Sequence, residues 1–284
     1  MCCLFGFVDY AGSLSVKQRN HLIRELSIAA EARGTDATGV AYNTSRGLQI
    51  YKRPIAARRL QLRIPVEARA VMGHTRMTTQ GSAKKNYNNH PFSGCVKGES
   101  FALAHNGVLW NDLELRHAKH LPRTKVQTDS YVSVQLIEQQ KALDFDSLRY
   151  MAEQVEGSFS FTVLDEQNAL WIVKGDNPLS IAHFPAVGVY AYASTAEILN
   201  KALTRCGKQL GHRRTVEVEM GDLLKIDRRG HITRATFDTS KLCRPSWDYW
   251  DSSLYAKSPK TEDEHIRLLK SIARAFGFTY LRDC

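Results

Sequence analysis

Short apolar blocks and alternating apolar and polar positions follow one another along most of the chain, which predicts many strands and few helices. The first block, residues 4–9, predicts a buried strand. Further strands are expected over residues 40–42, 48–52, 68–77, 101–105, 158–164, 170–174, 179–183, 187–193, 214–219 and 222–226. This pattern favours an α+β fold in which two antiparallel sheets pack together with helices outside.

Apolar residues spaced by three or four positions predict the helices. Ser13 or Ser15 can begin a helix that runs to about Arg33, and Gly34 would end it as a left-handed cap. Other helices are expected over residues 129–141 with Thr128 as the cap, 145–155, 196–206 and 262–276.

The chain changes character after about residue 230. We expect one domain over residues 2–230 and a C-terminal extension over residues 231–284. The extension contains Trp247, Tyr249 and Trp250 with little periodicity, so it either packs on its own domain or docks a partner.

Composition narrows the class of protein. The chain has 284 residues and a formal net charge of +10, but its basic residues are dispersed, which favours solvated surface charge over nucleic-acid binding. It has no apolar run long enough to cross a bilayer and no secretory signal, so no membrane partner is expected. Six cysteines without metal-type spacing predict free thiols, a reducing cytoplasmic location and no metal site.

Cys2 is the first candidate for chemistry. Removal of Met1 would leave a residue with both a thiol and an α-amino group, and an amine that titrates near neutrality can take the thiol proton. The alternative is that Cys2 is a small buried apolar residue.

Polar residues follow several of the predicted strands. Alternation places His74 and Arg76 on one face of a strand. The loop over residues 78–89 is either a lid over a small polar substrate or an ordinary surface loop. Asn106-Gly107 predicts a tight hairpin turn, although an amide beside a glycine N–H also suits an oxyanion hole. Asp129 either complements a helix dipole or binds a substrate ammonium group.

Taken in order, these motifs resemble the class II glutamine amidotransferase domain, which belongs to the N-terminal-nucleophile hydrolases. The resemblance covers roughly residues 2–230. The motifs that carry it are Cys2, Arg33-Gly-Thr-Asp36-Ala-Thr-Gly39, Gly73-His-Thr-Arg76-Met-Thr-Thr79-Gln-Gly81, Asn89-His-Pro91-Phe92, His105-Asn106-Gly107 and Thr128-Asp129-Ser130.

The resemblance implies a four-layer αββα sandwich and a role for each matching residue. Cys2 would attack the side-chain amide of glutamine, and a glutamyl thioester would form. Asn106 and Gly107 would hold the oxyanion, whereas Arg76 and Asp129 would bind the α-carboxylate and the α-ammonium group. Thr79 would lie on the substrate loop, Arg33 would order the Cys2 segment and His74 would support the site. No metal or cofactor is implied.

The chain also departs from the family. Met77 stands where relatives tend to have an aromatic residue, and the segment after residue 230 is too short for the usual acceptor domain. We therefore expect a separate synthase or acceptor subunit, docked by the C-terminal segment or the basic surface, or else a stand-alone glutaminase. Two other functions stay open: hydrolysis of another small amide, and non-catalytic nucleic-acid binding on the same scaffold.

Overall fold

The computed structural model describes residues 2–206 and 210–242. Its helices are α1 (Val16–Ala30), α2 (Asp112–Ala118), α3 (Tyr131–Gln140), α4 (Phe145–Gln154) and α5 (Ala196–Cys206), with short 3-10 turns η1 (Glu31–Arg33), η2 (Ala57–Arg59) and η3 (Asn86–Asn88). Its strands are β1 (Cys3–Asp9), β2 (Ala37–Thr44), β3 (Gly47–Arg53), β4 (Ala70–Arg76), β5 (Phe92–Val96), β6 (Glu99–Leu109), β7 (Gly157–Asp165), β8 (Leu170–Val173), β9 (Ser180–Phe184), β10 (Val189–Ala193), β11 (Arg214–Val216), β12 (Asp222–Ile226) and β13 (Ile232–Thr236).

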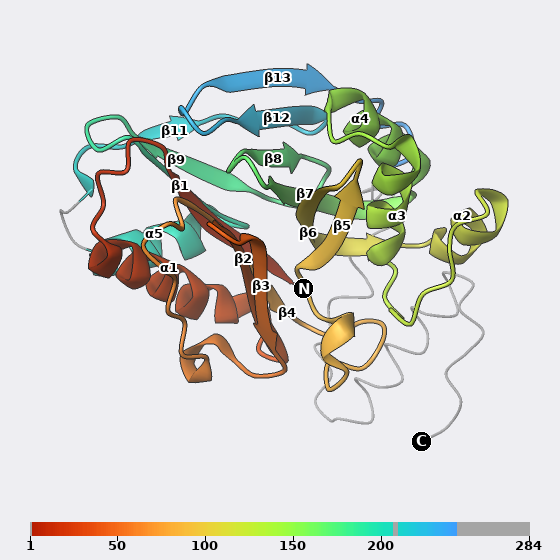
Figure 1. Cartoon of the computed structure of the whole chain (residues 1–284), viewed down its shortest axis with the longest axis horizontal. Coiled ribbons are helices and arrows are strands. Elements are labelled where there is room, and N and C mark those ends of the chain that lie inside the picture. Colours follow the sequence, from red (N-terminus) through yellow and green to blue (C-terminus); the bar gives the residue numbers. More distant parts are fainter. Residues whose placement is uncertain (1, 207–209, 243–284) are drawn as a thin grey trace, which may run out of the picture. The chain divides into compact units, whose positions relative to one another are not determined.

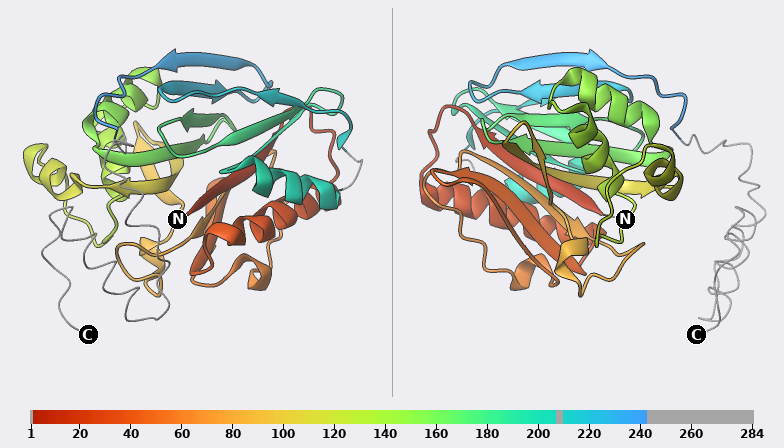
Figure 2. Two further views of the ribbon diagram at one scale, coloured as in Figure 1. Left: turned by 180° about the vertical axis from the view of Figure 1, so that it is seen from behind. Right: turned by 45° about the vertical axis from the view of Figure 1, so that its right-hand side comes forward.

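The strands form two antiparallel sheets that pack face to face. One sheet has the order β11-β9-β10-β1-β4-β2-β3 and the other has the order β13-β12-β8-β7-β6-β5. Helices α1 and α5 cover the outer face of the first sheet, and α3 and α4 cover the outer face of the second (Figure 1; Figure 2). The expected αββα sandwich is confirmed.

Strand β1 shows how alternation sorts side chains between the layers. Phe5 and Phe7 pack with the helices outside the first sheet, whereas Leu4 and Val8 belong to the core between the sheets. Both sets are buried, and burial of a large apolar side chain stabilises the fold by about 1.5–3 kcal/mol. Cys2 precedes Leu4 by two residues, so alternation places it on the same face, toward the layer between the two sheets.

The helix α1 begins as expected, but Gly34 acts differently from the prediction. Ser15 caps α1, and its side chain exchanges capping-box bonds with Gln18. Gly34 has φ 174°, which is extended, so the left-handed cap is wrong. A Cβ at Gly34 would lie 2.4 Å from the carbonyl carbon of Arg76. The glycine therefore allows η1 to approach the end of β4 closely.

Asn106-Gly107 does not form the expected hairpin turn. Strand β6 continues through it, with Asn106 opposite Ser160 and Gly107 opposite Phe159 on β7. Gly107 has φ +149°, and a Cβ there would lie 1.9 Å from the Ser158 carbonyl oxygen. The glycine is needed inside a strand, where a neighbouring backbone leaves no space for a side chain.

One other predicted boundary also shifts. Helix α3 begins at Tyr131 with Ser130 at its N-cap, and Thr128 is not the cap. Strand β13, which was not predicted, extends the second sheet past residue 230. The expected domain boundary stays a prediction. The segments 243–261 and 262–276 lie outside the described residues. Strand β5 and helix α2 were not predicted.

Among the described residues, no helix has both the length and the apolar character needed to span a bilayer.

Candidate active site

The candidate residues gather where the layer between the two sheets opens at the start of β1. On β4, Ala70 and Met72 belong to the core between the sheets, and alternation puts His74 and Arg76 on the same face. On β6, Ala102 and Ala104 set the same face for Asn106. These residues are distant in sequence, and the strand register brings them to one end of the sandwich.

A small pocket at this end brings several of the predicted residues together. It is lined by Cys2, Arg76, Met77, Thr79, Gln80, His90, His105, Gly107, Thr128, Asp129 and Ser130. Five predicted residues are therefore in one pocket: Cys2, Arg76, Thr79, Gly107 and Asp129. The other three, Arg33, His74 and Asn106, do not line it.

Cys2 is held at the edge of this pocket by its backbone. The Arg33 Nε donates to the Cys2 carbonyl at 2.8 Å, which is the contact that an ordering role requires. The thiol donates to the Met77 carbonyl at 3.5 Å. Burial raises the pKa of the Cys2 thiol, while the Met77 contact and the positive charge of Arg76 oppose that rise. The resting sulfur is therefore a protonated thiol that needs a base.

Arg76 is fixed by groups from the loop that follows it. One guanidinium nitrogen donates to Asn89 Oδ1 at 2.7 Å, and the other donates to the carbonyls of Gln80 and Gly81. Asp36 holds the start of this loop by accepting a bond from the Thr78 N–H at 2.8 Å. Burial lowers the pKa of Arg76, but an arginine remains charged at any ordinary pH. The pocket therefore has one rigid cation on its wall.

Asn106 is a buried amide without an internal partner. Neither its Nδ2 nor its Oδ1 has a hydrogen-bond partner among the described residues, although the side chain is 0% exposed. An unpaired buried polar group costs about 1–3 kcal/mol, so such a group suggests a site that binds something else. Asn106 and the adjacent Gly107 N–H have the chemistry of an oxyanion hole.

Asp129 supplies the opposite charge. Its carboxylate accepts bonds from the Leu109 N–H at 2.7 Å and from the Ser130 hydroxyl at 3.2 Å. Ser130 also contacts His105 Nδ1 at 2.8 Å. The carboxylate is thus oriented at the start of α3, as a binding group for an ammonium needs to be.

Three buried histidines lie at the pocket: His90 and His105 line it, and His74 contacts both of them. The His74 Nε2 contacts the His105 carbonyl at 2.9 Å, and the ring centroids of His74 and His90 are 4.2 Å apart. Burial lowers the pKa of His74 to about 3 and also lowers the pKa values of His90 and His105. All three are therefore neutral at physiological pH, and the supporting role of His74 stays a prediction.

Sequence reasoning assigned no role to Asn89, Ser130 or Lys52. Asn89 and Ser130 stood inside the family motifs, so their spacing to Arg76 and Asp129 could have identified them. Lys52 has no comparable signal, because its contacts are with backbone atoms far away in the sequence.

The chemistry of the described residues offers no metal centre. No group of three or more His, Cys, Asp or Glu side chains in residues 2–206 and 210–242 is arranged to hold a metal ion. Four described cysteines are free: Cys2, Cys3, Cys95 and Cys206. The reducing, cytoplasmic location stays a prediction.

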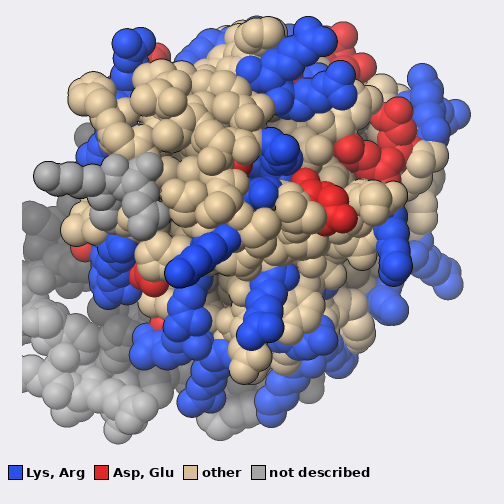
Figure 3. Space-filling view, turned by 60° about the vertical axis from the view of Figure 1, so that its left-hand side comes forward, with Lys and Arg blue, Asp and Glu red and all other residues tan. Residues whose placement is uncertain are grey.

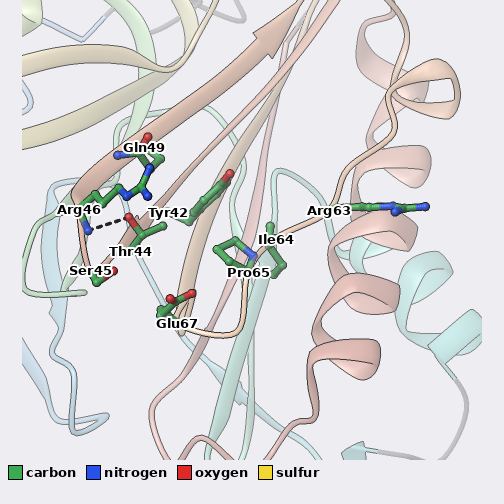
Figure 4. Close-up of a pocket in the computed structure, with 9 residues that line it drawn as sticks. All are labelled: Tyr42, Thr44, Ser45, Arg46, Gln49, Arg63, Ile64, Pro65 and Glu67. Carbon is green, nitrogen blue, oxygen red and sulfur yellow. Dashed lines mark hydrogen bonds between the residues drawn. The ribbon is translucent and has the colours of Figure 1, made fainter.

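A wider cavity of about 580 Å³ lies away from these residues. It is lined by Tyr42, Thr44, Ser45, Arg46, Gln49, Arg63, Ile64, Pro65 and Glu67, and Figure 4 shows Arg63 directed away from the other side chains. Its aliphatic hydroxyl groups belong to Thr44 and Ser45, and within the described residues neither is hydrogen-bonded to the Glu67 carboxylate, so its size does not make it the reactive centre.

Basic side chains are spread over the face of the described residues that Figure 3 shows. In Figure 3, Lys and Arg side chains are scattered over one face, with acidic and uncharged residues between them. A nucleic-acid site needs basic side chains gathered along a groove or one face. This face therefore gives no support to the nucleic-acid alternative.

Comparisons with known proteins agree with the site. A family model described as a glutamine amidotransferase domain matches residues 74–201. A glutamine–fructose-6-phosphate aminotransferase (isomerizing) from Bacillus spizizenii is 32% identical over 185 residues, covering 62% of this chain and 30% of the relative. The enzyme of the same name from Sulfurisphaera tokodaii is 31% identical over 194 residues, covering 64% and 31%. The match therefore spans about a third of the length of these relatives.

Solved structures show the same fold. The chain superposes on a glutamine phosphoribosylpyrophosphate amidotransferase from B. subtilis with a TM-score of 0.65 and 19% identity, covering 85% of this chain and 51% of that one. A structure described as the allosteric regulatory enzyme of purine biosynthesis gives 0.66 and 19% with the same coverage. The family model, the relatives and this fold together support a class II glutamine amidotransferase domain in this chain.

Proposed function

We propose that this protein hydrolyses the side-chain amide of glutamine to glutamate and ammonia, with Cys2 as the nucleophile after removal of Met1. The observation that carries the proposal is the pocket that unites a thiol, a cation and an anion, namely Cys2, Arg76 and Asp129. A free amino acid has a carboxylate and an ammonium group at one end, so this pair of charges suits its head group better than that of another amide.

The reaction would use the α-amino group of Cys2 as the base. The amine takes the thiol proton as the sulfur attacks the amide carbon, and Asn106 and the Gly107 N–H stabilise the resulting oxyanion. The carbon–nitrogen bond breaks, and the amine passes its proton to the departing nitrogen, which leaves as ammonia. Water then attacks the glutamyl thioester, which releases glutamate and restores the thiol.

The ammonia would go to an acceptor enzyme. The relatives' names describe the transfer of an amino group from glutamine to a sugar phosphate, and we propose a comparable use of the nitrogen here, with the acceptor site on a separate subunit. Crosslinking and recovery from the native host test this point. Recovery of no enzyme, with full glutaminase turnover by the isolated chain, would favour a stand-alone glutaminase.

The direct test is the Cys2→Ala variant. Its release of ammonia from glutamine should fall to the background rate, while the fold, followed by circular dichroism, stays intact. Cys95→Ala is the matched control, because Cys95 is a free cysteine exposed on β5. Intact-mass analysis after treatment with a glutamine-analogue electrophile should find Met1 absent and the label on Cys2. Undiminished turnover by Cys2→Ala would refute the proposal.

A further inference from the structure

Lys52 connects the edges of the two sheets but has no part in the chemistry proposed above. It lies on β3, the edge strand of the first sheet, and β5 is the edge strand of the second. Its Nζ donates to the carbonyl oxygens of Asn89 and Pro91, the latter at 2.8 Å, just before β5 begins. Its own carbonyl accepts a bond from Asn86 Nδ2 at 3.0 Å. Lys52 therefore holds the end of the loop over residues 78–91 at three points.

The same loop carries the side chain that fixes Arg76. Asn89 is 0% exposed, its Oδ1 accepts from Arg76 at 2.7 Å, and its Nδ2 donates to the Ala83 carbonyl at 2.8 Å. Lys52 thus holds the backbone of Asn89 while the side chain of Asn89 holds the guanidinium. The bond from Lys52 to the Asn89 carbonyl and the bond from Arg76 to Asn89 Oδ1 each have a charged donor, and charge-assisted bonds are about twice as strong as neutral ones.

We propose that Lys52 is a positioning residue for substrate binding, which places Asn89 so that Arg76 presents its guanidinium to the α-carboxylate of the substrate. The inference rests on the proposed hydrolysis of glutamine. Lys52 touches the substrate loop and not the reacting atoms, so it acts on binding of the carboxylate and not on the chemical step.

The surroundings of Lys52 add a dependence on pH. Burial, together with a smaller contribution from the positive charge of Arg76, lowers the pKa of Lys52 to about 8. The other groups facing it are the Phe92 ring, whose centroid lies 5.1 Å from Nζ, and the neutral imidazoles of His74 and His90. Above this pH the ammonium becomes an amine, and its bonds to the two carbonyls weaken. The Michaelis constant KM for glutamine should then rise above pH 8.

The experiment compares Lys52→Met with the wild type on two substrates. With glutamine at pH 7.5, KM should rise about tenfold because charge-assisted bonds are lost, while kcat changes less than about twofold. Glutamine α-amide has no α-carboxylate, so its KM should be the same in both proteins. Lys84→Met is the matched control, because Lys84 is exposed on the same loop; its KM should equal that of the wild type.

The outcomes separate this inference from the proposed function. If the wild type does not hydrolyse glutamine, both fail. If the wild type is active and Lys52→Met has an unchanged KM, or loses activity equally on both substrates, only the positioning role fails. If Lys52→Met does not fold, Lys52→Arg takes its place. Arginine keeps its charge above pH 8, so the KM for glutamine should rise less in Lys52→Arg than in the wild type between pH 7 and 9, and equal rises in the two proteins overturn the role.

Discussion

Buried polar groups lie at both ends of β1. The two ends differ in how many of these groups have hydrogen-bond partners within the protein. At the far end, Asp9 is 0% exposed and both of its carboxylate oxygens are bonded, one to the Ser13 N–H at 3.0 Å and the other to the Leu14 N–H at 3.3 Å. Arg19 lies 3.8 Å away and donates to the Ala68 carbonyl at 2.6 Å. This carboxylate is engaged entirely by the protein, although the Arg19 Nε beside it is buried without a hydrogen-bond partner among the described residues.

At the Cys2 end, several buried polar atoms have no hydrogen-bond partner within residues 2–206 and 210–242. They belong to His90, His105, Asn106 and Thr128, and three of these residues line the pocket while Asn106 precedes the lining Gly107. A fold tolerates unpaired buried groups only at a cost, so they mark a region selected for something other than stability. The contrast implies that substitutions near Asp9 should reduce stability, whereas those near Cys2 should reduce activity.

Asn106→Ala should give the largest effect. The loss of one oxyanion donor lowers kcat by about 100-fold to 1000-fold, and the melting temperature should hold or rise because an unpaired amide is removed. Asn43→Ala is the control, since Asn43 is also buried but its Nδ2 donates to the Asp165 carbonyl at 2.7 Å. That variant should lose about 1–3 kcal/mol of stability and keep its kcat. A lower stability with normal kcat in Asn106→Ala, and a lower kcat with normal stability in Asn43→Ala, would contradict the comparison between the two ends.

His74 should make the Cys2 end sensitive to acid. Its pKa is about 3 in the fold against about 6.5 when unfolded, so the unfolded chain binds more protons between these values. Stability therefore falls as pH drops through 6.5, by about 3 kcal/mol from this residue between pH 8 and pH 4.5. Urea unfolding at both pH values measures the loss. His74→Gln should reduce it, whereas His117→Gln on the exposed side of α2 should not; equal losses in both variants would contradict this assignment.

The sequence predicts individual helices and strands better than it predicts pairing between strands that are far apart in the sequence. Periodicity placed α5 at its observed bounds, residues 196–206. The Asn106-Gly107 prediction failed because a hairpin signal is local, while β6 continues through it by pairing with β7 more than fifty residues later. Gly34 was recognised as special for the wrong reason, because its close approach to Arg76 depends on the fold.

The residues that line the candidate site were predictable from the sequence. The residues that hold them in position were less predictable. The motifs identified the five residues that share the pocket. The residues that hold them, such as Lys52 and Asn89, act through backbone carbonyls and loop amides, which leave no periodic signal. The assigned catalytic roles stay proposals until the variants are measured.

Asp9→Asn tests the other end. An asparagine has one acceptor oxygen, so one of the two N–H groups of Ser13 and Leu14 would face an NH₂ group and lose its bond. Stability should fall by about 2 kcal/mol, measured by chemical unfolding, with kcat and KM for glutamine unchanged. A tenfold fall in kcat with normal stability would show that the two ends of β1 are coupled, contrary to the comparison.

Ser15→Ala should give the smallest effect and sharpen the same contrast. Ser15 begins α1, six residues after Asp9, and its side chain accepts from the Gln18 N–H at 3.3 Å. The loss of an N-cap costs about 1 kcal/mol, so the midpoint of urea unfolding should fall slightly. Ser15→Asp restores an acceptor and should recover most of the loss. Because α1 also carries Arg33 at the end of its continuation η1, glutaminase activity is the informative second measurement. An unchanged kcat means that the Cys2 end is held by its own contacts, whereas a lower kcat in Ser15→Ala, restored in Ser15→Asp, would mean that α1 transmits disorder along its length.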